Sequence, residues 1–361
     1  MLTEREQRRI LKGRNVAALI GAGIAGYLDA PLDEALLQRA AQISPTNPVV
    51  WAALGYRSFS LIANGLTNGG SMEATCQNAV DQWQKLAPEN AAPRYLAAAL
   101  AARQSNLAVA KQLLRVASQM DTFDSCEGPL NRCVVVALES AGRSRFTARL
   151  VGSGNVSGLV AWHKLSQSIL DSAPSREEIQ GCLQLGSQLA RDNSIATQML
   201  GWAIQKQGWA KIAEPTTPAE LARIAAARQH VRLANDYLES HRTRIVTEAQ
   251  WIDYFDRSFI VGEMTAIQEL AAQLGDTFSY ACRPANDSGR MFPHGSSASS
   301  PAGRKPTVRP ESVHFPIGLQ FRNPLPNRRI GPAAGFLFFH APAPLARRPH
   351  QPAQYHRHLG G

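Results

Sequence analysis

The spacing most suggestive of chemistry is a glycine triplet near the N-terminus, Gly21-Ala22-Gly23-Ile24-Ala25-Gly26, after the apolar run Val16-Ala17-Ala18-Leu19-Ile20. Where such glycines join a β-strand to a helix, they let the pyrophosphate of a dinucleotide approach the helix N-terminus. That chemistry also needs an acidic residue about 20 positions later to bind the ribose. Here no second strand ends in an acid near residues 40–50, and Pro31 interrupts the helix that should follow. We therefore favour a small-residue helix that packs closely against its neighbours.

The same segment leaves two alternatives open. It resembles the start of a flavin-binding domain, which implies a dinucleotide- or flavin-binding enzyme that uses residues 21–26. It also permits a signal peptide, because four cations precede the apolar stretch Val16 to Leu28, although acids dilute the charged region and three glycines weaken the stretch. We expect a cytoplasmic protein without a cofactor, and keep an exported helical-repeat protein, with residues 1–30 as the signal, as an alternative.

The other reactive side chains form no catalytic or metal-binding pattern. The cysteines have no C-x-x-C spacing and no body histidine at a zinc-ligand interval; they are Cys76, Cys126, Cys133, Cys182 and Cys282. Their odd number fits buried thiols in a reducing compartment. The pair Glu177-Glu178 fits the first turn of a helix better than an acid/base couple. We predict that the chain is not an enzyme and holds no catalytic, cofactor or metal site.

The net charge of +10 over 361 residues is unevenly distributed. Residues 284–361 contain 10 of the 38 Lys and Arg and two of the 28 acids, so this segment carries +8 and residues 1–283 carry +2. It also contains 13 of the 22 prolines, which break helix and sheet periodicity. We predict a disordered or irregular tail. Its cations are scattered and not interleaved with aromatics, which argues against nucleic acid as a partner, and a frameshifted tail is an alternative.

Residues 1–283 predict an all-α fold, and no apolar run is long enough to span a membrane. Ala, Leu, Gln and Arg dominate, and apolar residues recur at intervals of three and four. Polar caps with acids in the first turn predict helix starts at Ser175-Arg176-Glu177-Glu178 and Thr217-Pro218-Ala219-Glu220. Beyond residue 124 we predict a further helical region over 125–283, an irregular solenoid or a bundle. Its helices are expected over Leu159–Leu170, Arg176–Arg191, Ala219–His241 and Thr247–Leu274.

A repeat is indicated by Trp51-Ala52-Ala53-Leu54-Gly55, which follows the helix-closing Pro45-Thr46-Asn47. This segment resembles the first helix of the tetratricopeptide repeat (TPR), a 34-residue helix-turn-helix unit. With the frame fixed at Trp51, three units follow over residues 14–124: 14–47, 48–90 and 91–124. The small and large slots of their second helices carry Leu37, Ala40, Cys76, Val80, Trp83, Ala110, Leu114 and Ala117, where Trp83 departs from the small residue of the family.

The resemblance implies an α-solenoid scaffold that binds another protein or peptide in a concave groove lined by the first helices. Carried over residue by residue, the inward slots are Asn15, Ala18, Val49, Tyr56, Phe59, Tyr95, Ala99 and Arg103. We predict the partner-binding residues to be Asn15, Val49, Tyr56, Phe59, Tyr95 and Arg103. Aromatic anchors beside a cation are common at binding hot spots. The open alternative for the three aromatic residues is that they are core residues between the helices.

Overall fold

The chain divides into two units, Met1–Pro284 and Ala285–Gly361, in a computed structural model. The structure describes residues 2–25, 30–66, 70–154, 158–212, 214–242 and 246–276. All of them belong to the first unit. The predicted disorder of residues 284–361 lies outside the described residues.

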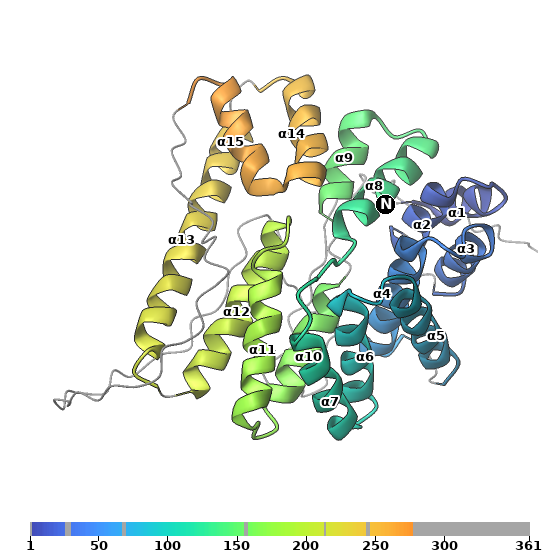
Figure 1. The fold of residues 1–361 in the computed structure, drawn as a ribbon. Coiled ribbons are helices and arrows are strands. Elements are labelled where there is room, and N and C mark those ends of the chain that lie inside the picture. The colour runs from blue at the N-terminus through green and yellow to red at the C-terminus, as the bar shows by residue number, and fades with distance from the viewer. Residues whose placement is uncertain are drawn as a thin grey trace, which may run out of the picture. The chain divides into compact units, whose positions relative to one another are not determined.

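The described residues form 15 α-helices and no β-strand, which confirms the all-α prediction for this part of the chain (Figure 1). The helices of the first half are α1 (Glu4–Leu11), α2 (Val16–Ile24), α3 (Ala30–Ile43), α4 (Pro48–Ala63), α5 (Gly70–Leu86), α6 (Ala91–Arg103), α7 (Leu107–Ser118) and α8 (Glu127–Ser140). Those of the second half are α9 (Arg145–Ser153), α10 (Leu159–Leu170), α11 (Arg176–Leu189), α12 (Ile195–Lys211), α13 (Thr217–Arg242), α14 (Glu248–Val261) and α15 (Glu263–Gln273).

Each of the three units predicted over residues 14–124 contains one pair of packed helices. The pairs are α2 with α3, α4 with α5, and α6 with α7, and each pair also contacts the next. The first helix of each pair starts after an asparagine whose side chain accepts a backbone N–H: Asn15 from Ala18 at 3.1 Å, Asn47 from Val49 at 3.0 Å and Asn90 from Ala92 at 3.1 Å. The eight predicted slots of the second helices are all buried. These positions of the second helices therefore face the interior of the described residues.

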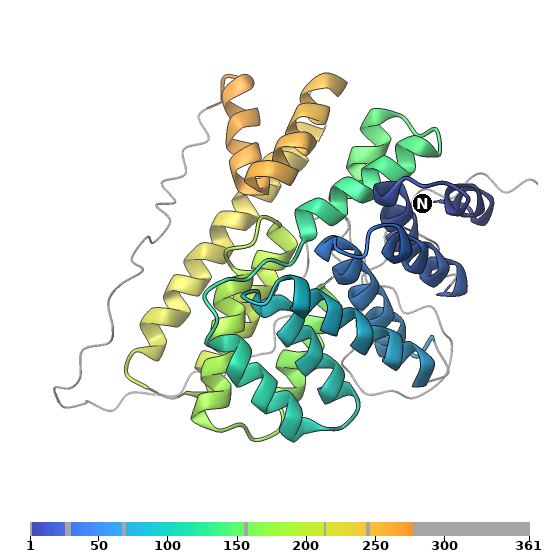
Figure 2. The same cartoon turned by 45° about the vertical axis from the view of Figure 1, so that its right-hand side comes forward.

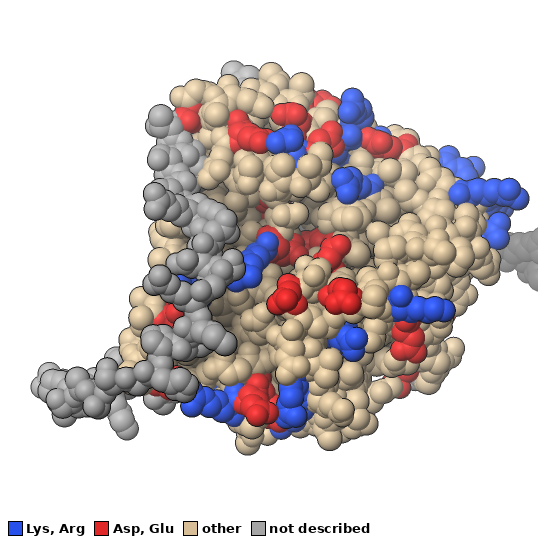
Figure 3. All heavy atoms as spheres, viewed as in Figure 1, with Lys and Arg blue, Asp and Glu red and all other residues tan. Residues whose placement is uncertain are grey.

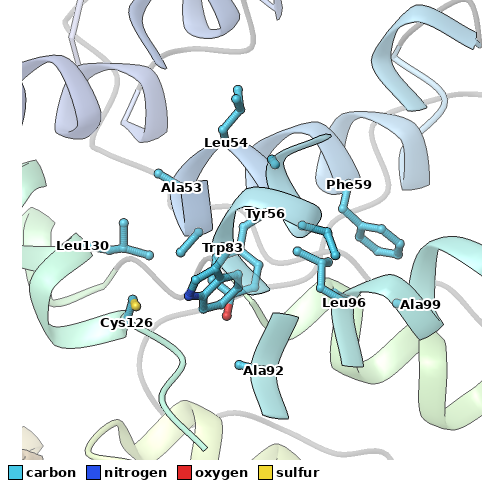
Figure 4. Packing of buried hydrophobic residues seen from close by; sticks show 14 of the residues in the cluster. Ala53, Leu54, Tyr56, Phe59, Trp83, Ala92, Leu96, Ala99, Cys126 and Leu130 are labelled. Carbon is cyan, nitrogen blue, oxygen red and sulfur yellow. The ribbon is translucent and has the colours of Figure 1, made fainter. Parts of the chain in front are cut away.

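Trp83 fills the slot where the repeat family has a small residue. Its side chain is completely buried and meets the ring of Tyr56 edge to face, with ring centroids 5.5 Å apart. Figure 4 shows these two rings together at the centre of the core, with Leu96 and Phe59 nearby. The helices α4 and α6, which contact α5 or each other, also bury small residues completely, among them Ala53 and Ala92.

The chain does not continue by stacking on α7 alone. Instead, α8 returns to the N-terminal end and makes its most extensive contact with α2, as both ribbon views show (Figures 1 and 2). Helix α10 lies on α6 and α4, whereas α11 packs against α7 and pairs with α12. Helices α8 and α10 therefore pack on the first helices of the three predicted units, which are α2, α4 and α6. Helix α11 packs on α7, the second helix of the third unit.

Two glycines of the candidate dinucleotide motif, Gly21 and Gly23, lie inside this arrangement, and the third, Gly26, lies outside the described residues. Residues 16–24 are helical, so no strand precedes Gly21, and the strand-turn-helix context of a dinucleotide site is missing. A Cβ on Gly21 would lie 1.9 Å from the carbonyl oxygen of Cys133 in α8, and one on Gly23 would lie 2.6 Å from Leu37 in α3. These glycines allow α2 to pack closely against both neighbours, the role that we favoured from the sequence.

One expected helix differs from the structure, and two expected helix starts are found. The single helix expected over Thr247–Leu274 is broken into α14 and α15, because Gly262 adopts a φ of 90° that the α-helix cannot contain. The helix expected over residues 219–241 is α13, which begins at Thr217, where the polar cap predicted a start. Ser175 caps α11 together with Glu178, as their spacing predicted. None of the helices in the described residues is long and apolar enough to cross a membrane.

Candidate functional site

The three aromatic residues of the predicted groove are core residues. Tyr56, Phe59 and Tyr95 are 2%, 1% and 0% exposed, so their rings present no surface to a partner in this conformation. The hydroxyls of the two tyrosines form hydrogen bonds within the protein. Tyr56 donates to the Ser125 carbonyl at 3.1 Å, and Tyr95 donates to Gln188 Oε1 at 2.9 Å. The core alternative left open by the sequence is the one that the structure adopts.

The helix that covers the two tyrosine rings is α10, through Trp162. This indole is fully buried and meets Tyr56 and Tyr95 edge to face, with centroids 5.7 and 6.4 Å away. Such pairs contribute on the order of 1 kcal/mol each beyond the burial of their area. The position that the repeat resemblance reserves for a partner helix is thus occupied by a helix of the same chain.

The other three predicted groove residues remain nearer the surface. Asn15 is exposed and uses its side chain to cap α2, Val49 is half-buried in the first turn of α4, and Arg103 is exposed at the end of α6. Partner binding by these residues stays a prediction.

A surface pocket of about 260 Å³ lies between α3, α4 and α5. Its apolar lining consists of Ala41, Trp51 and Leu54, and its polar lining consists of Gln38, Gln42, Thr75 and Asn78. No lining residue is charged. Such a mixture is typical of sites that hold an apolar group and orient it by a few hydrogen bonds.

The pocket is preorganised by a fixed indole. Trp51 is half-buried, and its Nε1–H donates to the Pro45 carbonyl at 2.7 Å, so the ring direction is set by the turn that closes the preceding unit. On the rim, Gln42 and Asn78 are exposed. Gln38 donates to Glu34 Oε1 at 2.7 Å, which fixes one further rim amide. A ligand would therefore meet an indole held in place and three exposed amides, of which Gln38 donates to Glu34 and Gln42 Oε1 accepts from Arg39 at 3.3 Å.

A second unusual site is a junction where the N-termini of α8, α12 and α15 meet. The N-cap residue of α12, Ser194, makes no side-chain capping bond. The cap is supplied instead by the other helices: Ile195 N–H donates to Glu263 Oε2 at 2.6 Å, and the Thr197 hydroxyl donates to Glu127 Oε2 at 2.7 Å. We name the three carboxylates Glu127, Glu263 and Asp192 the carboxylate junction; Asp192 lies in the α11–α12 turn.

Asp192 links the junction to the start of α8. It accepts the Ser125 hydroxyl at 2.8 Å and the Ser194 N–H at 3.1 Å. Between Ser125 and α8, Cys126 has a φ of 58°, a left-handed conformation that costs a non-glycine residue about 1 kcal/mol or more. On the face of the molecule seen in Figure 1, acidic side chains lie near the centre (Figure 3).

The carboxyl groups of the junction hold their protons more strongly than usual. Burial raises the pKa of Glu263 to about 7, and the charge of Asp192 also raises it. The hydrogen bond from the Ile195 N–H lowers this pKa and so opposes part of the rise. Burial also raises the pKa of Glu127 well above its ordinary value, with Asp192 as the next cause. The pKa of Asp192 is raised by burial, although bonds from Ser125 and from backbone N–H groups oppose the shift. Within the described residues, none of these three carboxylates forms a salt bridge.

Other chemistry finds little support in the described part of the chain. No group of three or more His, Cys, Asp or Glu side chains there is arranged to hold a metal ion. Four of the cysteines are free and buried; burial raises the pKa of Cys76 and Cys182 to about 12 and that of Cys133 to about 11. These thiols are poor nucleophiles, because the reactive form is the thiolate.

The sequence reasoning missed most residues of both sites. Trp51 was identified as a repeat signature, but the rim amides Gln42 and Asn78 carry no local signal beyond their exposed helix faces. Of the three junction acids only Asp192 has one: the polar segment Asp192-Asn193-Ser194 directly precedes α12, and the similar Asp124-Ser125 comes shortly before α8. Such polar segments predict where helices begin, but they do not predict that the N-termini of different helices meet. The chain matches no protein-family model, and comparisons with curated proteins and with solved structures gave no match.

Proposed function

We propose that the chain is a protein-binding scaffold of the TPR-like solenoid class, and that it binds its partner at the pocket between α3, α4 and α5. The observation that carries the proposal is the uncharged, preorganised pocket built around Trp51, the residue on which the repeat resemblance rests. The agreement of three helix pairs with one repeat frame supports the class.

The pocket chemistry defines the ligand. The floor of Ala41, Trp51 and Leu54 favours an apolar side chain, and burial of apolar surface contributes about 25 cal/mol per Å². The amides of Gln42 and Asn78 can each donate to and accept from a peptide backbone. A charged ligand would lose its hydration without gaining a counter-charge from the lining. We therefore propose an extended peptide segment with an uncharged apolar anchor.

The test uses peptides selected on the full chain from a display library, followed by affinity measurements on variants. Gln42→Glu with Asn78→Asp adds two negative charges to the rim while leaving the apolar floor intact. We expect at least a tenfold weaker affinity, about 1.4 kcal/mol, because the ligand buries these charges. The matched control is Gln112→Glu, an exposed position on α7 away from the pocket.

The results distinguish binding at this pocket from binding in the concave groove that the repeat resemblance implies. Equal affinity of the selected peptides for wild type and the rim variant would refute the pocket as the binding surface. A loss on Arg103→Ala, with no loss on the rim variant, would instead support binding near the end of α6.

A further inference from the structure

The hairpin of α14 and α15 contacts α13 and is also fastened to the other described helices at two places. On α14, Asp256 accepts from Arg149 Nε of α9 at 2.7 Å, and the Phe259 carbonyl lies 3.0 Å from the position of a Cβ on Gly128 of α8. On α15, the Glu263 carboxylate caps α12 and the Glu263 N–H donates to the Asn193 carbonyl at 2.9 Å. The second fastening is the carboxylate junction.

The second fastening brings three acids to one point. Glu263 is faced by Glu127 from α8 and by Asp192 from the α11–α12 turn, and Asp192 is also faced by Asp124 from the linker before α8. The helix N-termini offset part of the repulsion, because each carries a partial positive charge. In the described residues no cation pairs with the three junction acids, so within this part of the chain they are neutralised only by a proton.

The charged groups on and around the other neighbours of α15 have hydrogen-bond or salt-bridge partners of their own. Between α14 and α15, Arg257 holds Glu269 through two bonds of 2.7 Å. Toward α13, the Tyr237 hydroxyl donates to Asp276 at 3.0 Å. Asp253 on α14 accepts from Gln273 at 3.0 Å, and the nearest pairing on the α9 side is the Arg149–Asp256 bridge. None of these pairs includes Glu263.

We propose that the carboxylate junction is a proton-controlled latch, which holds the α14–α15 hairpin on the α11–α12 turn in acid and loosens as Glu127, Asp192 and Glu263 lose protons. A protonated Glu263 still accepts the Ile195 N–H through its carbonyl oxygen, so the cap survives neutralisation. When the acids ionise together, like charges oppose the same contact. This proposal is independent of the peptide pocket.

The direction with pH follows from the raised pKa values. The docked state holds Glu263 with a pKa of about 7, whereas a released, solvated glutamate has its ordinary 4.5. The docked state thus binds more protons, and docking is strongest below about pH 4.5 and weakens as pH rises to about 7. One pKa unit corresponds to a tenfold change in the equilibrium, so Glu263 alone sets a ceiling of a few hundred-fold. Partial exposure reduces this, and we expect 10- to 100-fold.

The experiment is native-state hydrogen exchange of the full chain between pH 5 and pH 8, corrected for intrinsic exchange rates. We expect protection of α14, α15 and the first turn of α12 to fall at least tenfold more than protection of α4 and α6. Glu263→Gln keeps the cap acceptor without a titrating proton, so it should stay protected at pH 8. Glu248→Gln, an exposed acid on the same hairpin, is the control and should keep the wild-type profile.

Three outcomes would overturn the latch. The first is a wild-type hairpin whose protection does not depend on pH. The second is a Glu263→Gln profile that runs parallel to wild type, and the third is loss of hairpin protection in that variant at every pH, which would make Glu263 a cap alone. If that variant also loses protection in α4 and α6, Glu127→Gln is measured in its place and judged by the same outcomes.

Discussion

Gly21→Ala should be among the most destabilising single-methyl additions in the chain. The added Cβ would lie 1.9 Å from the Cys133 carbonyl oxygen, 2.3 Å from its carbon and 2.7 Å from the Val134 nitrogen. Ordinary contacts start near 3.4 Å, and all three neighbours are backbone atoms that cannot rotate away. Helices α2 and α8 must therefore move apart by roughly 1.5 Å along their most extensive contact, which loosens tightly packed side chains.

The net cost is about 2–4 kcal/mol, as overpacking and lost contact outweigh the gain of about 1 kcal/mol that Ala brings to a helix. The assay is urea unfolding of the full chain, with the change read from the midpoint at constant slope. The matched control is Gly70→Ala in the first turn of α5, where a Cβ meets nothing within 4 Å and stability should be unchanged or higher by up to about 1 kcal/mol. If Gly21→Ala behaves like Gly70→Ala, then α2 and α8 do not cross as described and the packing role of the glycines is wrong.

Two further changes test the interior by the same unfolding assay. Asp33→Asn should cost about 3 kcal/mol, because the fully buried carboxylate pairs with Arg57 and accepts Gln7 Nε2 at 2.8 Å, whereas Glu4→Gln in the exposed Arg8 pair should cost less than about 0.5 kcal/mol. Equal effects would show that the Asp33 pair is not buried. Trp162→Ala should cost about 3–5 kcal/mol and Trp162→Phe clearly less; a loss below about 1 kcal/mol for alanine would show that α10 does not fill the core between the repeats.

The helix pairs of residues 14–124 were predictable because their determinants are local. Small and large residues at fixed spacings decide which face of a second helix turns inward, and Leu37, Val80 and Leu114 are all at most 1% exposed. The asparagine caps lie within three residues of the helix starts that they satisfy. The break at Gly262 was missed, because a glycine inside a periodic pattern is tolerated in many helices, and only the contact with Asn193 shows that a turn is needed.

The two sites were less predictable, because each is assembled from segments far apart in the chain. Glu127 and Glu263 are 136 positions apart and meet only through the start of α12. The neutral rim amides are chemically ordinary on any helix surface and become notable only beside Trp51. A pattern of single residues carries no information about which helix N-termini converge.

The aromatic residues show why composition cannot separate a binding groove from a core. Tyr56 and Tyr95 lie on the first helices where the repeat resemblance expects a partner, and large aromatic rings stabilise an interface and an interior by the same burial. The difference lies in a later segment of the chain, since Trp162 arrives on α10 to cover both rings. A short array of such repeats exposes its apolar inner face unless something covers it. In this chain the cover is supplied by α10, whose Trp162 meets both tyrosine rings.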